Sequence, residues 1–203
     1  VYVADTFNNH FEPDILRDAQ RVLAAAGYEV VVVQGADRPL CCGRTYLGTG
    51  MVDRAKAEAR RTLDALLPWA RAGISIVGLE PSCLFSFRDE YLVLGLGPEA
   101  EELSKAALLF EEFIVREHSA GRLKAPFKPM AGARALLHTH CHQKAFGAVP
   151  AVQQALALVP DLKVEHVDSS CCGMAGSFGM EVEHVEVSRA MGDLSLLPAV
   201  RAA

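Results

Sequence analysis

The sequence concentrates its potential chemistry in six cysteines, which stand at four places along the chain. Two adjacent pairs are each followed by glycine, in the triplets Cys41-Cys42-Gly43 and Cys171-Cys172-Gly173. Each triplet follows a run of residues typical of a β-strand and precedes a glycine-rich turn. Core packing does not explain adjacent cysteines, because neighbouring side chains on a strand point to opposite faces. Thiolates gathered from separate segments are the ligands that an iron–sulfur cluster or a zinc ion requires.

The composition excludes several classes of protein. The 203 residues are 51% hydrophobic, enough to bury a core as one domain or as two small packed halves. The formal net charge of -5 argues against nucleic acid and anionic membrane surfaces as partners. We find no apolar stretch near the roughly 18 residues of a transmembrane segment, and no signal peptide. Six cysteines could instead form three disulfides in a secreted protein, but adjacent cysteines suit that poorly, so we expect a reduced, cytoplasmic protein.

The first half alternates segments typical of strands and helices. Strands are expected at 1–4, 28–33 and 74–78, and helices at about 13–26 and 51–70. The run at 28–33 is almost continuously β-branched, as in a strand that is buried on both faces. Because the sequence begins within an expected strand, we expect it to be a piece of a longer polypeptide.

The second half repeats this order. Strands are expected at 135–138 and 163–168, with a helix at about 150–158 between them and another helix beginning near Met180. A single helix is expected over 98–121. The alternation predicts an α/β fold of right-handed βαβ units, with two pseudo-repeated lobes and mostly parallel sheets, Rossmann-like but without a dinucleotide fingerprint. The expected boundaries are a first lobe at 1–97, a connecting helix and linker at 98–134, and a second lobe at 135–203 that is truncated at its C-terminal end.

Every cysteine follows an expected strand, and ligands of parallel sheets bind at the carboxyl ends of the strands. The thiols of each lobe should therefore converge at one edge, as Cys41, Cys42 and Cys83 in the first lobe and Cys141, Cys171 and Cys172 in the second. Gly43 and Gly173 would let the backbone approach a cluster closely. Backbone N–H groups of the glycine-rich turns would then donate to sulfur and tune the reduction potential.

Structural alternatives accompany these candidate ligands. A lone cysteine such as Cys83 is more often a core residue than a ligand. His138, His140 and His142 flank Cys141 and could add nitrogen ligands, although for His140 and His142 capping or hydrogen bonding to nearby backbone is the default role. Three thiolates and one further ligand suit either tetrahedral zinc or an iron–sulfur cube, so the residues leave the metal open.

The motifs resemble the cysteine-rich CCG domain that occurs in heterodisulfide reductase and in the iron–sulfur subunits of glycolate, lactate and glycerol-3-phosphate dehydrogenases. The resemblance covers essentially the whole chain. It is strongest to the C-terminal part of fused proteins that carry an FAD-binding oxidase domain and a ferredoxin-like segment. It is carried by the two triplets with their flanking residues, by Asp5-Thr6-Phe7, by Gly78-Leu79-Glu80-Pro81-Ser82-Cys83, and by His140-Cys141-His142-Gln143-Lys144.

The sequence departs from the full family motif, which is a single cysteine, a Cys-Cys-Gly triplet and a Cys-x-x-Cys pair. In the first half Thr6 most closely matches the single cysteine, and Glu80 stands at the first position of the pair. In the second half the sequence ends before the closing pair. A five-thiolate non-cubane cluster is therefore not assumed. A 4Fe-4S cubane with three thiolates and another ligand, or zinc, fits what remains.

The resemblance implies the electron-transfer domain of an FAD-linked 2-hydroxy-acid dehydrogenase of the D-lactate, glycolate or D-2-hydroxyglutarate type. The partners implied are an FAD-binding domain or subunit, a ferredoxin-like segment and an electron acceptor such as a quinone, with a cytoplasmic location that could include the inner face of the membrane. No catalytic residue is assigned, and the fragment is expected to be inactive without the flavin domain. The alternatives are a structural or docking domain whose thiolates bind zinc or stay unligated, and direct thiol–disulfide catalysis, which would need an exposed thiolate of low pKa.

Overall fold

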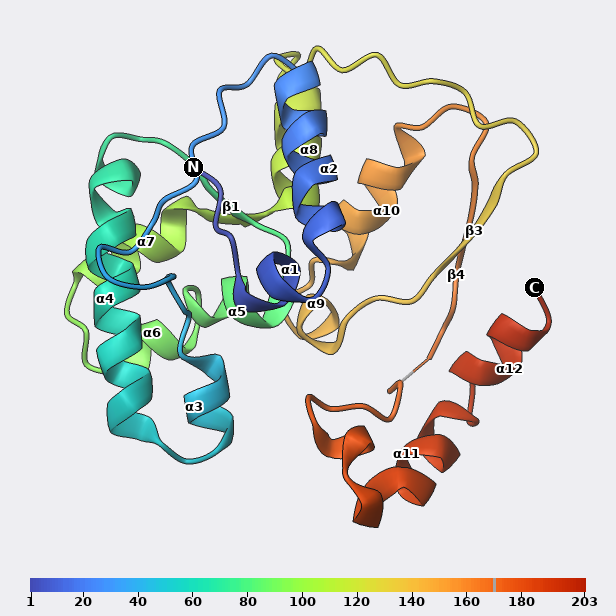
Figure 1. The fold of residues 1–203 in the computed structure, drawn as a ribbon. Coiled ribbons are helices and arrows are strands. Elements are labelled where there is room, and N and C mark those ends of the chain that lie inside the picture. The colour runs from blue at the N-terminus through green and yellow to red at the C-terminus, as the bar shows by residue number, and fades with distance from the viewer. Residues whose placement is uncertain (170) are drawn as a thin grey trace. The chain divides into compact units, whose positions relative to one another are not determined.

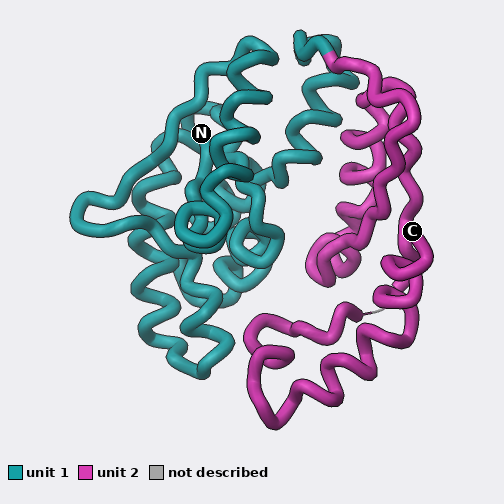
Figure 2. The backbone as a smooth tube through the Cα atoms, turned by 45° about the vertical axis from the view of Figure 1, so that its right-hand side comes forward, with its two compact units in different colours: residues 1–126 teal, residues 127–203 magenta. Residues whose placement is uncertain are grey.

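The computed structural model describes residues 1–169 and 171–203 (Figure 1). The chain divides into two compact units, which are unit 1 at Val1–Pro126 and unit 2 at Phe127–Ala203 (Figure 2). In both units helices follow parallel strand segments, so the expected α/β class is confirmed.

Unit 1 places helices between parallel strand segments, and α2, α4 and β1 agree closely with the segments expected at 13–26, 51–70 and 74–78. In chain order its elements are α1 (Thr6–His10), α2 (Pro13–Ala25), α3 (Arg44–Gly48), α4 (Val52–Arg71), β1 (Ile76–Gly78), α5 (Pro81–Ser86), α6 (Glu90–Val93), α7 (Glu99–Ala106), β2 (Ala107–Leu109) and α8 (Phe110–Ser119).

The sheet of unit 1 is short. Strand β1 pairs in parallel with β2, and Tyr2 makes parallel bridges to Val77 on one side and Val32 on the other. In place of the strands expected at 1–4 and 28–33, the structure therefore has isolated β-bridges at Tyr2 and Val32. The segment 28–33 lies at the outer end of this order, so its valines are half-buried instead of being buried on both faces.

The helix expected over 98–121 is interrupted by β2. Ala107, which fits the apolar face of such a helix, is instead almost fully buried beside β1, as is Leu109. Pairing with a buried strand overrides the local helical pattern here, because strand formation depends on packing against neighbours. Two helices, α7 and α8, therefore replace one.

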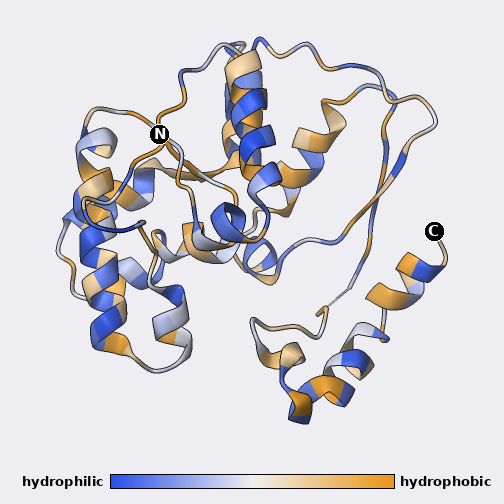
Figure 3. Cartoon of the chain, viewed as in Figure 1, coloured by the Kyte–Doolittle hydropathy of each residue, from blue (hydrophilic) through white to orange (hydrophobic). Residues whose placement is uncertain are grey.

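The core of unit 1 lies where α4, α5 and α7 meet the sheet. Helix α4 has 20 residues and carries both hydrophobic and hydrophilic bands (Figure 3). Within the described residues, no helix is long and apolar enough to cross a membrane. The largest fully buried side chains of this unit are Tyr2, Tyr91, Phe85, Phe87, Leu63, Leu66, Ile76, Leu84, Leu103, Leu109 and Thr62.

Unit 2 has a pair of parallel strands whose residues are half-buried or exposed. Arg134 is paired with Lys163 at one end of the register and Leu137 with His166 at the other. The helix expected near Met180 begins at Val185, after two short 3-10 turns. The elements are β3 (Arg134–Leu137), α9 (Cys141–Ala145), α10 (Val149–Ala157), β4 (Lys163–His166), η1 (Phe178–Met180), η2 (Val182–His184), α11 (Val185–Gly192) and α12 (Leu196–Arg201).

Candidate metal centre

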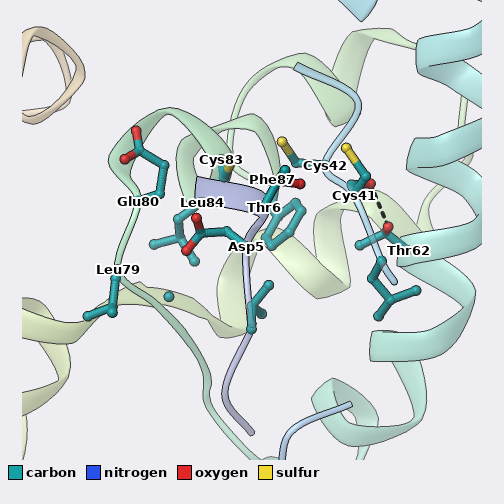
Figure 4. Close-up of a pocket in the computed structure, with 13 residues that line it drawn as sticks. Asp5, Thr6, Cys41, Cys42, Thr62, Leu79, Glu80, Cys83, Leu84 and Phe87 are labelled. Atoms are coloured by element: carbon teal, nitrogen blue, oxygen red, sulfur yellow. Dashed lines mark hydrogen bonds between the residues drawn. The ribbon is translucent and has the colours of Figure 1, made fainter. Parts of the chain in front are cut away.

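Three cysteines of unit 1 line one pocket. Cys41 and Cys42 come from the loop before α3, and Cys83 comes from the first turns of α5. The side chains lie close together beside the end of the first strand segment (Figure 4). The pocket has a free volume of about 10 Å³, roughly the room that a single water molecule needs. The free space beside the thiols is therefore small in this structure, although the pocket is partly open and Cys41 is only half-buried.

The thiols of this pocket influence one another's pKa. The neighbouring Cys42 thiol and burial raise the pKa of Cys41. The neighbouring Cys41 thiol lowers the pKa of Cys42, but the Cys83 thiol and burial outweigh it, so that this pKa is raised as well. The thiols of Cys41 and Cys42 therefore hold their protons at neutral pH and must release them to bind a metal.

The glycine of the first triplet allows a close approach to α4. Gly43 has φ +84°, a region that other residues rarely adopt. A Cβ on it would lie 2.8 Å from the carbonyl oxygen of Ala55. The same turn brings the Gly43 N–H within 3.5 Å (N···S) of the Cys41 sulfur.

Two buried hydroxyls hold the backbone of the cysteine pair. Thr62 Oγ1 donates to the carbonyl of Cys41 at 2.7 Å, and this bond is drawn in Figure 4. The Tyr91 hydroxyl donates to the carbonyl of Cys42 at 3.1 Å. Sequence reasoning missed both roles. Thr62 fits the apolar face of its helix, and nothing near Tyr91 in the sequence points to a cysteine 49 residues away.

Glu80, which stands at a cysteine position of the family motif, has a local structural role. Its carboxylate caps α5 by accepting hydrogen bonds from the backbone N–H and the hydroxyl of Ser82. It lies at the opposite end of the pocket from Cys41 (Figure 4). Pro81 occupies the first position of the helix, where its missing N–H is not needed. Cys83 thus stands on a short helix and not on the expected loop.

In unit 2 the thiols of Cys171 and Cys172 lie close enough to Cys141 to influence its pKa. Burial raises the pKa of Cys141, and the two other cysteines add to this, although the Cys141 residue as a whole is exposed. Cys141 is the first residue of α9. This side of the unit therefore holds the three thiols that sequence reasoning grouped together.

The second triplet repeats the geometry of the first. Gly173 has φ +88°, and its N–H lies 3.3 Å (N···S) from the sulfur of Cys171. A Cβ on Gly173 would lie 2.1 Å from the carbonyl oxygen of Ser188, so this glycine also packs against the backbone of a following helix, α11. Both triplets thus form the same turn against a helix.

Polar contacts hold the two cysteine segments of unit 2 together. Ser169, which precedes the second triplet, accepts a hydrogen bond from Lys144 through its carbonyl, and its hydroxyl lies 2.7 Å from His138 Nδ1. Lys144 belongs to α9 and therefore ties that helix to the segment before Cys171. His140 caps α9, accepting the backbone N–H of His142 at Nδ1, so the capping role expected for it is confirmed.

The donor set fits a thiolate-bound metal, but the thiols do not yet surround a single point. Across residues 1–169 and 171–203, no group of three or more His, Cys, Asp and Glu side chains is arranged to hold a metal ion. The thiols of each unit lie near one another instead. A cluster with several irons accepts ligands that are spaced further apart than those of one ion, and N–H groups directed at sulfur are the donors that such a cluster uses.

Comparisons with known proteins place the chain in a family. The family model described as "Cysteine-rich domain", CCG, matches residues 4–88 and 135–196, which include all six cysteines. The chain belongs to this family, as the motifs indicated. The two matched segments lie in unit 1 and unit 2 respectively, and each contains one of the two triplet turns.

The chain is similar to parts of several oxidoreductases. It is 28% identical over 187 residues to one of the subunits of anaerobic glycerol-3-phosphate dehydrogenase of Escherichia coli K12, covering 92% of this chain and 46% of that protein. It is 28% identical over 195 residues to D-2-hydroxyglutarate dehydrogenase of the same strain, covering 95% and 18% respectively. Lactate utilization protein A 1 of Bacillus mycoides is 26% identical over 187 residues, covering 86% and 70%. The chain thus spans under half of the first two relatives.

Proposed function

We propose that this chain is the electron-transfer domain of an FAD-linked dehydrogenase that oxidises a 2-hydroxy acid or a related alcohol. The observation that carries the proposal is the pocket that gathers Cys41, Cys42 and Cys83, in which the Gly43 N–H is directed at the sulfur of Cys41. Relatives named for D-2-hydroxyglutarate, lactate and glycerol-3-phosphate support the substrate class. An FAD-binding domain or subunit, and an acceptor such as a quinone, would lie outside this chain.

The residues of the chain would bind and tune an iron–sulfur cluster. When bound, such a cluster accepts and releases one electron at a time, as is needed between a two-electron flavin and its acceptor. The cysteines would lose their thiol protons on binding. The Gly43 and Gly173 N–H groups would then donate to thiolate sulfur, which favours the more negative, reduced state. No side chain is assigned to acid–base chemistry, and a cytoplasmic location is proposed.

We further propose that the two units derive from a repeat, with lobes at 1–97 and 135–203 joined by 98–134. The similar φ angles of the two triplet glycines, and their matching N–H···S contacts, support this. A cluster of 4Fe-4S type, held by three thiolates and a further ligand, is the form proposed for each occupied unit.

A structural domain that binds zinc, or leaves its thiols unligated, is the second candidate. It is favoured by the small free volume of the pocket, in which the thiols of Cys41 and Cys42 lie near one another and keep their protons. In that case the raised pKa values of Cys41 and Cys42 would reflect core thiols.

Metal analysis of the full-length protein, purified without oxygen, separates these candidates. We expect roughly four irons with matching acid-labile sulfide for each occupied unit. The double variant C41S/C42S should lose the iron bound by unit 1, and C171S/C172S should lose the iron bound by unit 2. Each variant therefore serves as the control for the other. Stoichiometric zinc, or iron content unchanged in both variants, would overturn the proposal.

A further inference from the structure

The peptide group between Cys42 and Gly43 is fixed at both ends. Its carbonyl oxygen accepts the hydrogen bond from the Tyr91 hydroxyl at 3.1 Å. Its N–H approaches the sulfur of Cys41 at 3.5 Å. The peptide is trans, and in a trans peptide the C=O and N–H bonds point in opposite directions. A donor that holds the carbonyl therefore also directs the N–H.

Packing holds the side chain of Tyr91 in place. Its side chain is fully buried, and its ring packs against Phe87 with centroids 5.0 Å apart. A buried carbonyl without a hydrogen-bond partner costs free energy, so this bond stabilises the conformation of the cysteine loop. Thr62 holds the preceding carbonyl, that of Cys41, at 2.7 Å.

We propose that Tyr91 is a positioning residue of the candidate metal centre, and that its hydroxyl aims the Gly43 N–H at the Cys41 sulfur and so raises the reduction potential of a cluster held in unit 1. The orientation of the peptide stands on the geometry of this chain. The effect on potential rests on the proposed function. A hydrogen bond to thiolate sulfur stabilises the added negative charge of the reduced state, so that losing it makes reduction harder.

Unit 2 offers an internal reference for this effect. Its triplet forms the same contact, with the Gly173 N–H 3.3 Å (N···S) from the sulfur of Cys171. The carbonyl of Cys172, however, lies beside Gly192, where a Cβ would stand 3.3 Å from its oxygen. Tyr91 belongs to unit 1, so its loss should leave the contact in unit 2 unchanged.

The first test uses the metal-free chain of 203 residues. Hydrogen exchange of the Gly43 amide, measured by NMR, should become about tenfold faster in Tyr91→Phe, because the net contribution of one hydrogen bond corresponds to roughly a power of ten. Tyr28→Phe is the matched control, since it loses a tyrosine hydroxyl bond to Glu117 elsewhere in unit 1. Equal protection of Gly43 in the two variants would refute the positioning role.

A second variant covers the case in which Tyr91→Phe does not fold. Thr62→Val keeps the shape of the side chain and frees the carbonyl of Cys41. It should raise exchange at Gly43 in the same direction, because the two carbonyls belong to consecutive peptides. A folded Thr62→Val protein with unchanged exchange at Gly43 would count against the inferred role of these hydroxyls.

The second test measures potentials in the full-length protein loaded with iron and sulfide. The midpoint potential assigned to unit 1 should fall by about 59 mV in Tyr91→Phe, which corresponds to a tenfold change for one electron, whereas that of unit 2 should stay constant. If exchange at Gly43 is faster but the midpoint potential of unit 1 is unchanged, the proposed effect of Tyr91 on the potential is wrong. A wild-type protein that takes up no cluster would refute the proposed function, and the exchange experiment would still decide the positioning role.

Discussion

Replacing Gly43 with alanine should test whether the triplet turn depends on its contact with α4. Gly43→Ala faces two costs. The positive φ of +84° costs a residue with a side chain roughly 1 to 2 kcal/mol. The new Cβ would also lie 2.8 Å from the Ala55 carbonyl oxygen, and backbone inside a helix yields poorly, which adds about 1 to 3 kcal/mol. The two costs together lower the unfolding free energy by about 2 to 5 kcal/mol.

Gly50→Ala is the matched control because it carries the first cost without the second. Gly50 has φ +75°, and a Cβ there would meet nothing within 4 Å. Its variant should lose only about 1 to 2 kcal/mol. Equilibrium urea unfolding, followed by the fluorescence of the single tryptophan, Trp69 of α4, reports on unit 1 in both variants. If Gly43→Ala is no less stable than Gly50→Ala, the close approach to α4 does not constrain the turn.

Two further predictions concern polar contacts. Arg122 above all lowers the pKa of Glu117 to about 2, and a carboxyl with a depressed folded pKa stabilises the protein above its unfolded pKa and loses that effect on acidification. Glu117→Gln should therefore cost about 3 kcal/mol at pH 7, with the difference from wild type vanishing between about pH 5 and 2; a difference independent of pH, followed by Trp69 fluorescence, would contradict this. Lys144→Met should speed deuterium exchange in the segment before the second triplet, because it removes a hydrogen bond that contributes roughly 1 kcal/mol to stability. Lys163→Met on β4 is the control and should leave this exchange unchanged. Equal exchange in the two variants would show that the Lys144 hydrogen bond does not hold the segment.

The long helices and the grouping of the cysteines could be predicted from the sequence. The apolar face of α4 and the proline at the start of α2 are local signals, and the structure follows them. Cysteines placed after strands of a parallel sheet meet at one edge, and the structure brings Cys41, Cys42 and Cys83 into one pocket. Whether they bind metal stays a prediction.

Features that depend on distant partners could not be predicted. β2 looks helical from its neighbours and becomes a strand because β1 lies beside it. The valines of 28–33 suggest full burial, but a strand segment at the end of the sheet order is covered less completely. Tyr91 finds the carbonyl of Cys42 only through the fold. In each case the deciding contact joins residues far apart along the chain.

The two triplet turns differ in what fixes them, although their local geometry is the same. The positive φ of the glycine and the N–H···S contact occur in both units. The side chains that hold each turn come from other parts of the sequence. In unit 1 the fully buried hydroxyls of Thr62 and Tyr91 hold the turn. In unit 2 the tie comes from Lys144, and the strands beside it are half-buried or exposed. A hydrogen bond between buried groups opens rarely, because water cannot reach the groups to replace it. Unit 1 should therefore keep its sulfur geometry without metal, whereas unit 2 should depend more on a bound group to keep Cys141 beside Cys171.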